Sequence, residues 1–579
     1  MTLRGRLLFA GLLSLLLFVG LLCLALFLSS SDAPLARDVE SPRLAVLVYF
    51  DQLRGDYLTR WDKLFGEGGF HRLEKDGAWF QNCHYPYSDT VTAVGHASVA
   101  TGCSPRTHGI IANDWYDRAA GASVYCVSSE RYERVPPRTL TVGDDAKNDK
   151  KKLKGVSPER LLAPTLADAL KEATEGKGGV VSLSLKDRSA VLPGGRRPDA
   201  CYWLDTVSGS FVTSTYYRDR LHPWMAEFNR SGTVDAWMGE EWTRFRDDLD
   251  YDKYSGPDDA VGEGTTLFCR TFPHALDGGV LKLKSAYYGS IYNSPFGNEV
   301  LLALARRAIE AEQLGKHDTP DLLCISFSSN DAIGHCWGPD SHEVLDVTLR
   351  TDKIIEELLA CLDKQVGKGR YVLALTADHG VCPLPEATRR GGGAAARINT
   401  TTLFKGARAF LGEKFHVPAD DNLWVEWYGG EWLYLNRALL ARNHLKQSEV
   451  EAALADWLRK QPDIERVYTR SQMLAGVAAD DAVGQRVRRA FYPERSGDVR
   501  IIVKPYCLMT TSLTGTTHGT PHAYDTHVPL LVYGAGVQPG ARRDRITPQA
   551  AAVILAQALG IKPPVKADAA APTDLFPSR

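Results

Sequence analysis

Three apolar segments of this 579-residue chain each lead into an aspartate. Leu44–Phe50 stops at Asp51, Tyr371–Ala377 stops at Asp378, and Leu322–Phe327 reaches Asp331 through three polar residues. Short apolar, β-branched runs between polar positions are typical of strands that are buried on both faces. Strands of this kind form the parallel sheets of α/β proteins, so we predict an α/β core.

The carboxyl ends of these strands are the expected position of a functional site. In open α/β sheets, ligands bind just outside the carboxyl ends of the strands. Three carboxylates gathered at this edge would repel one another unless a positive group lies among them. A metal site is the simplest arrangement that meets this requirement.

The character of the chain changes after the glycine-rich stretch Gly391–Ala396. Leu423–Trp427 and Glu431–Leu435 flank a Gly-Gly pair, which predicts a β-hairpin. Val499–Tyr506 is expected to return the chain to the core. We therefore predict four segments: residues 1–30 as a signal peptide or membrane anchor, 43–394 as the first part of the catalytic core, 395–505 as a small α+β insertion, and 506–579 as the last part of the core.

The N-terminus predicts export. Arg4 and Arg6 precede Leu7–Leu28, which is uncharged and long enough to cross a bilayer as a helix. A cleaved signal peptide is the alternative, with Ser29–Ser31 as a small-residue cleavage site. Either reading places the rest of the chain in the periplasm or at the cell surface, tethered to the membrane if the helix is kept. The net charge of −2 and pI near 6.7 argue against nucleic-acid binding.

Three histidines accompany the three aspartates. Asp331 and His335 are four residues apart, which places them on one face of a helix. His379 directly follows Asp378, and His518 lies in the small-residue loop Gly515–Gly519. Carboxylate and neutral imidazole are ligands of zinc and similar metals. Six ligands are too many for one tetrahedral zinc, but three for each of two metals would leave open positions for catalysis.

Thr92 is the candidate nucleophile. It is predicted to be the N-cap of a helix over Thr92–Thr101, where the helix N-terminus would favour an alkoxide and an anionic substrate. An ordinary helix cap is the alternative. Lys186 and Arg188 follow a strand predicted at Gly178–Leu185; two positions apart, they would share one face and could bind phosphate together.

Five segments of the chain are similar, in identity and order, to the alkaline phosphatase superfamily, in its type I phosphodiesterase/nucleotide pyrophosphatase branch. They are Phe50-Asp51-Gln52, Thr92-Ala-Val-Gly-His96, Asn330-Asp331-x-x-Gly-His335-x-x-Gly-Pro339, Ala377-Asp378-His379-Gly380 and Thr517-His518-Gly519. Within this branch the chain most resembles the phosphate-irrepressible alkaline phosphatases, which use a threonine nucleophile. The resemblance implies a three-layer α/β/α core with a mostly parallel sheet.

The resemblance also implies a site with two zinc ions, or another divalent metal in one position. Asp331, His335 and His518 would hold one metal; Asp51, Asp378 and His379 would hold the other, with Thr92 beside it. Lys186, Arg188 and Asn113 would contact the phosphate oxygens. The implied reaction is double displacement through a phosphothreonine, on a phosphorylated small molecule. Val94, where many relatives have proline, changes loop stiffness and removes no ligand.

Two other functions stay open from the sequence. A phosphodiesterase or nucleotide pyrophosphatase could use the same scaffold, although a diester carries less charge for Lys186 and Arg188 to match. A membrane-tethered binding protein that has lost the reaction is the alternative from a different class. The complete set of metal-ligating residues argues against that reading.

Overall fold

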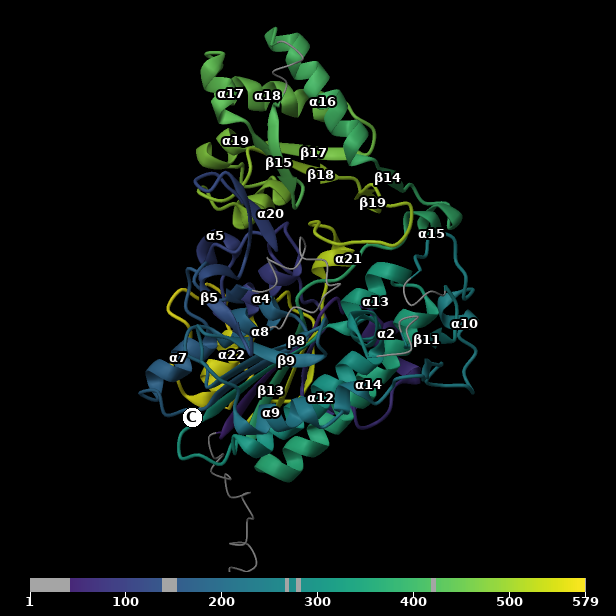
Figure 1. Ribbon diagram of the computed structural model, residues 1–579, viewed down its shortest axis with the longest axis vertical. Coiled ribbons are helices and arrows are strands. Elements are labelled where there is room, and N and C mark those ends of the chain that lie inside the picture. Colours follow the sequence, from purple (N-terminus) through teal and green to yellow (C-terminus); the bar gives the residue numbers. More distant parts are fainter. Residues whose placement is uncertain (1–41, 138–153, 266–269, 278–282, 418–422, 578–579) are drawn as a thin grey trace, which may run out of the picture. The chain divides into compact units, whose positions relative to one another are not determined.

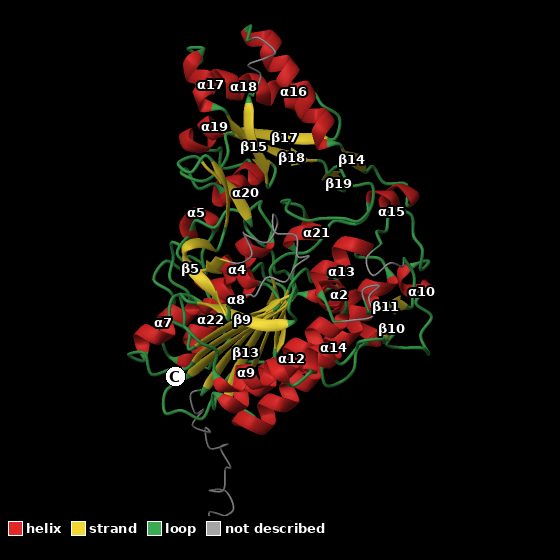
Figure 2. Ribbon diagram, in the orientation of Figure 1, coloured by secondary structure: helices red, strands yellow, loops and turns green. Residues whose placement is uncertain are grey.

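The computed structural model describes residues 42–137, 154–265, 270–277, 283–417 and 423–577. Its largest element is an eleven-stranded mixed sheet (Figures 1 and 2). In spatial order the strands are β21 (Gly540–Arg542), β2 (Ala78–Phe80), β20 (Leu530–Gly534), β13 (Tyr371–Ala377), β1 (Leu44–Phe50), β12 (Asp321–Phe327), β7 (Val180–Ser184), β8 (Ala200–Asp205), β9 (Ser210–Ser214), β5 (Ser128–Val135) and β6 (Lys154–Val156).

The centre of this sheet is parallel and its flanks are mixed. Strands β13, β1, β12, β7 and β8 run parallel to their neighbours, whereas β20 and β9 join them antiparallel on either side. Helix α22 (Ala550–Leu559) packs on β13 and β1, and α12 (Pro295–Ala311) packs on β12 and β7. Helices cover both faces of the sheet in Figure 2, so the predicted three-layer α/β/α core is confirmed.

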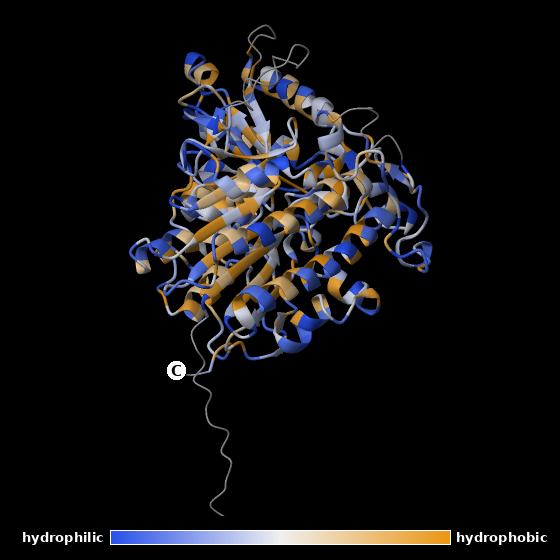
Figure 3. Ribbon diagram, turned by 60° about the horizontal axis from the view of Figure 1, so that its bottom comes forward, coloured by the Kyte–Doolittle hydropathy of each residue, from blue (hydrophilic) through white to orange (hydrophobic). Residues whose placement is uncertain are grey.

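The three strands that the sequence singles out lie side by side. Every residue of β1, β12 and β13 is buried. Phe50 is in register with both Phe327 and Ala377, so the three strands end at the same level of the sheet. In Figure 3 the central strands are mainly hydrophobic, whereas the helices mix hydrophobic and hydrophilic residues. This is the pattern expected for a sheet covered on both faces.

A smaller four-stranded antiparallel sheet forms within the predicted insertion. Its order is β15 (Val425–Gly429), β16 (Trp432–Leu435), β18 (Val499–Val503) and β17 (Ile464–Thr469). Helices α16 (Thr400–Phe415) and α18 (Gln447–Leu458) contact each other and share an apolar cluster with this sheet. The predicted hairpin is confirmed. The prediction that Val499–Tyr506 returns the chain to the core is wrong, because β18 pairs with β16 and β17.

The boundaries 395–505 remain a prediction, as does the N-terminal segment. Leu7–Leu28 lies outside the described residues. Among the residues that the structure does describe, no helix combines the length and the apolarity needed to cross a membrane.

Candidate active site

Asp51 and Asp378 lie close together because strands β1 and β13 end at the same level of the sheet. Asp51 follows β1 directly, and its backbone N–H donates to the carbonyl oxygen of Phe327 at 2.9 Å. Asp378 follows β13, and its Oδ1 accepts from the backbone N–H of Gln52 at 3.0 Å. Both aspartates are fully buried. The sheet therefore places these two carboxylates next to each other at its carboxyl edge.

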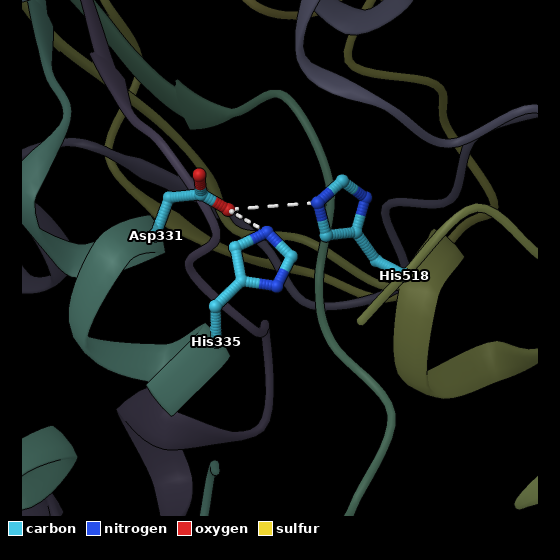
Figure 4. Close-up of side chains that lie close together, drawn as sticks. All are labelled: Asp331, His335 and His518. Carbon is cyan, nitrogen blue, oxygen red and sulfur yellow. Dashed lines mark ion pairs between the residues drawn. The ribbon is translucent and has the colours of Figure 1, made fainter. Parts of the chain in front are cut away.

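One predicted metal set is assembled from a helix and a loop (Figure 4). Asp331 and His335 lie on α13 (Ser329–Trp337), and His335 Nε2 is 3.2 Å from Asp331 Oδ1. His518 comes from a loop, with its Nε2 3.5 Å from the same oxygen. The Nδ1 atoms of the two histidines donate to the backbone carbonyls of Thr516 at 2.8 Å and Thr90 at 2.7 Å. Each Nε2 is therefore left as a metal ligand.

The second predicted set lies beside the first. His379 Nε2 is 3.5 Å from both Asp51 Oδ1 and Asp378 Oδ2, while its Nδ1 donates to the carbonyl of Gly380 at 2.9 Å. Ligand atoms of Asp51, Asp331 and His379 also lie within 4.8 Å of one another, so Asp331 adjoins both sets. The structure thus brings all six predicted ligands into one site.

The chemistry of these residues fits a divalent cation. Asp51 Oδ1 and Asp378 Oδ2 are buried and have no hydrogen-bond partner within the described part of the chain. A buried carboxylate oxygen without a partner is costly, and a cation would remove that cost. Burial, together with Asp51, raises the pKa of the Asp378 carboxyl well above its usual range. Burial and the neighbouring His518 lower the pKa of His379, which keeps the imidazole in the neutral form that binds metals.

Asp331 has a different electrostatic environment. Burial alone would raise the pKa of its carboxyl, but Lys186 and His335 hold that pKa well below its usual range. Lys186 Nζ lies 2.6 Å from Asp331 Oδ2 and 2.7 Å from Asp51 Oδ2, so it bridges carboxylates of the two predicted metal sets. Gln52, which the sequence analysis did not assign, donates from Nε2 to Asp331 Oδ1 at 2.7 Å.

Thr92 faces the second metal set. Its Oγ1 is 3.5 Å from His379 Nε2 and 3.4 Å from a terminal nitrogen of Arg188. The prediction that Thr92 caps helix α4 (Thr92–Thr101) is wrong. Val91 is the N-cap, in an extended conformation, and Thr92 is the first helical residue. The hydroxyl is therefore not engaged as a cap and can serve as a nucleophile.

Lys186 and Arg188 both reach the site, although not from a strand. Strand β7 ends at Ser184, Lys186 is the N-cap of α8 (Asp187–Gly194), and Arg188 lies in its first turn. The predicted strand alternation is therefore wrong, because the strand ends at Ser184 and a helix begins at Asp187. Arg188 also contacts the hydroxyl of Tyr125 at 3.3 Å, and that hydroxyl donates to Asp187.

Asn113 lies next to the nucleophile. Its Oδ1 accepts from the backbone N–H of Ala93 at 2.9 Å. The amide is oriented by this bond, so its Nδ2 is the donor that Asn113 can offer to a phosphoryl oxygen.

His96 is a site residue to which sequence reasoning gave no role. It is fully buried; its Nδ1 lies 2.8 Å from the carbonyl of Thr92 and 3.3 Å from Asp378 Oδ2, and its Nε2 lies 2.7 Å from Ser326 Oγ. His96 thus joins helix α4 to strand β12 through Ser326 and packs beside the Asp378 carboxylate. Gln52 and His96 both stand in the segments that carry the family resemblance, which was the available signal. No sequence feature pointed to Tyr125.

Comparisons with known proteins identify relatives of this chain. The type I phosphodiesterase/nucleotide pyrophosphatase family matches residues 45–525. Alkaline phosphatase PafA of Elizabethkingia meningoseptica is 35% identical over 509 residues, covering 87% of this chain and 88% of the relative. Alkaline phosphatase PhoV of Synechococcus elongatus is 33% identical over 512 residues, covering 87% of each chain.

The fold of this chain is also similar to that of a solved alkaline phosphatase structure. The crystal structure of wild-type alkaline phosphatase PafA matches with a TM-score of 0.84 and 32% identity, covering 93% of this chain and all of that one. The buried carboxylates, with the imidazoles of His335, His379 and His518 beside them, form a site suited to divalent metal ions. By sequence and by fold, this chain belongs to the type I phosphodiesterase/nucleotide pyrophosphatase family of the alkaline phosphatase superfamily.

Proposed function

We propose that this protein hydrolyses phosphate monoesters, with Thr92 as nucleophile and two zinc ions as cofactors. One observation carries the proposal. The Thr92 hydroxyl lies between the Arg188 guanidinium and the His379 imidazole, at the edge of a cluster of three aspartates and three histidines. Two relatives, each covering 87% of this chain, are named alkaline phosphatases.

The six ligands divide into two sets in this proposal. Asp331, His335 and His518 would hold one zinc, and Asp51, Asp378 and His379 would hold the other, with Thr92 as a further ligand. When bound, the metals supply Lewis-acid stabilisation of negative charge on oxygen. Tetrahedral zinc takes nitrogen and oxygen ligands of this kind and leaves a position open in catalytic sites.

The residues of the chain carry out the rest of the reaction. Thr92 Oγ1 loses its proton to solvent and forms a bond to phosphorus while the bond to the ester oxygen breaks. The ester oxygen leaves with that electron pair and takes a proton from solvent, which gives the alcohol. Water then displaces Thr92 from phosphorus, yielding inorganic phosphate and the free hydroxyl. The first turn of α4 and Arg188 favour the threonine alkoxide. Arg188 and Asn113 stabilise charge on the nonbridging oxygens as it develops.

Charge favours a monoester over a diester. A monoester dianion carries one more negative charge than a diester at neutral pH, and the site offers two cations, the buried Lys186 and the half-buried Arg188. Arg188 can bind two phosphate oxygens at once through its planar fork. Lys186, held between Asp51 and Asp331, compensates their charge as well.

A comparison of two substrates tests the proposal. Purified, zinc-loaded protein is expected to hydrolyse nitrophenyl phosphate with a higher kcat/KM than bis-nitrophenyl phosphate. The Thr92→Ala variant, prepared in the same way, controls for a contaminating phosphatase. Faster cleavage of the diester by the wild type would favour the phosphodiesterase instead.

The substrate is proposed to be a phosphorylated small molecule outside the cytoplasm. The apolar stretch Leu7–Leu28 supports export, as a cleaved signal or as a retained anchor. Cell fractionation and the mass of the mature N-terminus test this. Full-length protein in the cytosolic fraction would contradict export.

A further inference from the structure

Arg500 is a fully buried arginine in strand β18 of the smaller sheet. Its neighbours Val499 and Ile501 belong to the apolar cluster of that sheet, whereas Arg500 does not. The Arg500 side chain pairs with Asp89, with a terminal nitrogen 2.7 Å from Asp89 Oδ1. Asp89 is 4% exposed and lies three residues before Thr92. The other oxygen of Asp89 accepts from the indole nitrogen of Trp432, on the adjacent strand β16, at 3.5 Å. The smaller sheet therefore holds the segment that leads into the nucleophile helix.

The same guanidinium reaches a second segment of the site. Its NH2 group donates to the carbonyl oxygen of Gly519 at 3.2 Å, one residue after His518. Its NH1 group donates to the carbonyl of Gly430 in the β15–β16 turn and lies 3.4 Å from Glu431. One side chain thus joins the turn of the smaller sheet, the segment before Thr92 and the loop of His518.

The two site segments also bond directly to each other. The carbonyl of Thr90 accepts from His518 Nδ1 at 2.7 Å, and the hydroxyl of Thr90 donates to the carbonyl of Thr520 at 2.9 Å. Arg500 contacts both segments next to these bonds, at Asp89 beside Thr90 and at Gly519 between His518 and Thr520. Its position therefore bears on the distance between Thr92, beside one predicted metal set, and His518, which belongs to the other.

The chemistry of Arg500 suits positioning better than simple stabilisation. A buried ion pair gains little net stability, because the desolvation of both charges offsets their attraction. What arginine adds is a rigid planar fork that fixes several acceptors at once, which the single ammonium of lysine does not reproduce. Here the two hydrogen-bond acceptors, Gly430 and Gly519, and the ion-pair partner Asp89 belong to three segments that are far apart in the sequence.

We propose that Arg500 is a positioning residue, through which the smaller sheet fixes the segment of Thr92 against the loop of His518. The inference rests on the proposed function for the roles of Thr92 and His518. It goes further by giving the smaller sheet a part in catalysis.

Four variants and a control test this inference. Arg500→Gln removes the fork, Arg500→Lys keeps the charge, Asp89→Asn removes the partner, and the double variant removes both charges. Arg437→Gln is the matched control, because Arg437 pairs with the buried Asp498 in the same region at 3.0 Å and contacts neither site segment through that pair. For each protein, kcat, KM, zinc content and unfolding temperature are measured.

Misplacement of reacting groups by a fraction of an ångström predicts a loss in kcat of about 10- to 100-fold for Arg500→Gln and Arg500→Lys. KM and zinc content should change by less than about threefold, since the metal ligands and phosphate contacts are intact. The double variant should recover part of the unfolding temperature lost in Arg500→Gln, because it removes the buried Asp89 carboxylate that Arg500→Gln leaves unpaired, while the half-buried Glu431 stays. It should not recover kcat. Arg437→Gln should keep wild-type kcat.

Wild-type kcat in Arg500→Lys, or in the double variant, would overturn the inference, because a point charge or no charge would then suffice. The double variant and Arg500→Lys keep the test decisive if Arg500→Gln does not fold.

If the wild type hydrolyses neither ester, the proposed function fails on its own. In that case hydrogen exchange of the backbone amides in residues 89–92 and 518–520 replaces kcat: wild-type protection in Arg500→Lys overturns the inference, and faster exchange in both segments supports it.

Discussion

His518 Nδ1 lies 2.7 Å from the backbone carbonyl oxygen of Thr90, two residues before Thr92. A carbonyl oxygen only accepts hydrogen bonds, so Nδ1 carries the proton and Nε2 keeps a lone pair. That lone pair faces Asp331 at 3.5 Å. One hydrogen bond therefore orients a predicted metal ligand and ties it to the segment that bears the nucleophile.

Replacing Thr92 tests whether it is the nucleophile. Thr92→Ala is expected to lower turnover by at least about 1,000-fold, since no oxygen remains to accept phosphorus. Zinc content should stay near the wild-type value, because the six Asp and His ligands are intact. Thr92→Ser should retain activity and, after acid quenching, a phosphorylated residue that mass spectrometry can locate. Wild-type turnover in Thr92→Ala would show that the nucleophile is misassigned.

Lys186 is expected to matter more for monoesters than for diesters. Lys186→Ala removes one of two cations near the phosphate, so monoesterase kcat/KM should fall by at least tenfold more than diesterase kcat/KM. The variant also leaves Asp51 and Asp331 without their shared partner, so zinc affinity is measured alongside. Equal losses on both substrates at full zinc occupancy would contradict a role for Lys186 on the phosphate.

Removing the metals should cost both activity and stability. Asp51 and Asp378 each have a buried carboxylate oxygen without a hydrogen-bond partner in the described structure. A cation that binds only the folded state raises the unfolding temperature by mass action. Chelation followed by dialysis should therefore abolish turnover and lower that temperature. Adding zinc, manganese or magnesium separately identifies the metal, and activity in protein shown to be metal-free would refute the metal site.

Gly95 is a close-packing position between α4 and the end of β13. A Cβ atom at residue 95 would lie 2.6 Å from the Cβ of Asp378 and even closer to its carbonyl oxygen. Gly95→Ala should therefore push α4 away from Asp378, with a cost of about 1–3 kcal/mol and at least a tenfold loss of kcat.

Gly289 provides the matched control for this change. It lies within helix α11 (Ser285–Tyr292), and among the described residues outside its own helix nothing lies within 4 Å of the added Cβ. Gly289→Ala should keep kcat and raise stability slightly, as expected for alanine in a helix. Chemical denaturation and steady-state kinetics of both variants provide the measurements. An active, stable Gly95→Ala protein would show that the contact can relax.

His108 should make the protein sensitive to acid. It is fully buried, accepts the backbone N–H of Ile110 at Nδ1 (3.1 Å) and contacts Ser98 Oγ through Nε2 (2.9 Å). Burial lowers its pKa to about 3. Because the unfolded pKa is about 6.5, the unfolded state binds the proton first as the pH falls. The contribution of His108 is therefore complete above about pH 6.5 and is lost progressively toward pH 3.

The expected loss from His108 is about 3 kcal/mol near pH 4. Urea unfolding from pH 7 to 4 measures the slope of stability against pH. His108→Gln should reduce that slope whatever its effect at pH 7, whereas His416→Gln, at an exposed position, should not. An unchanged slope in His108→Gln would show that the histidine is protonated without cost.

Much of the core could be predicted because burial leaves a local pattern. The runs ending at Phe50, Phe327 and Ala377 are apolar throughout, since a strand covered on both faces has no polar side. Asp331 and His335 could be placed together because a helix brings positions four apart onto one face. The motifs supplied the remaining ligands through their resemblance to a family.

Boundaries and partners were predicted less well. The sequence predicts Thr92 as the N-cap, whereas Thr92 is the first helical residue; it also predicts strand geometry for Lys186 and Arg188, whereas Lys186 caps helix α8 and Arg188 lies in its first turn. Two cationic side chains indicate phosphate binding, and the sequence shows that much. The direction in which Lys186 and Arg188 point depends on how helix α8 packs. Strand β18 looks like any buried strand, and nothing local tells which sheet it joins.

The sequence by itself determined the kinds of groups available: three aspartates at strand ends, three histidines, a threonine and two cations. It determined their order along the chain and the buried strands that deliver two of the aspartates. Tertiary structure decided which groups meet, because register brings Phe50, Phe327 and Ala377 level and side chains such as Lys186 then bridge residues far apart in the chain. It also decided that Arg500, in the smaller sheet, reaches Asp89 and Gly519. Contacts of this kind join segments that are far apart in the chain, and the sequence of one segment does not show which other segment it will pack against.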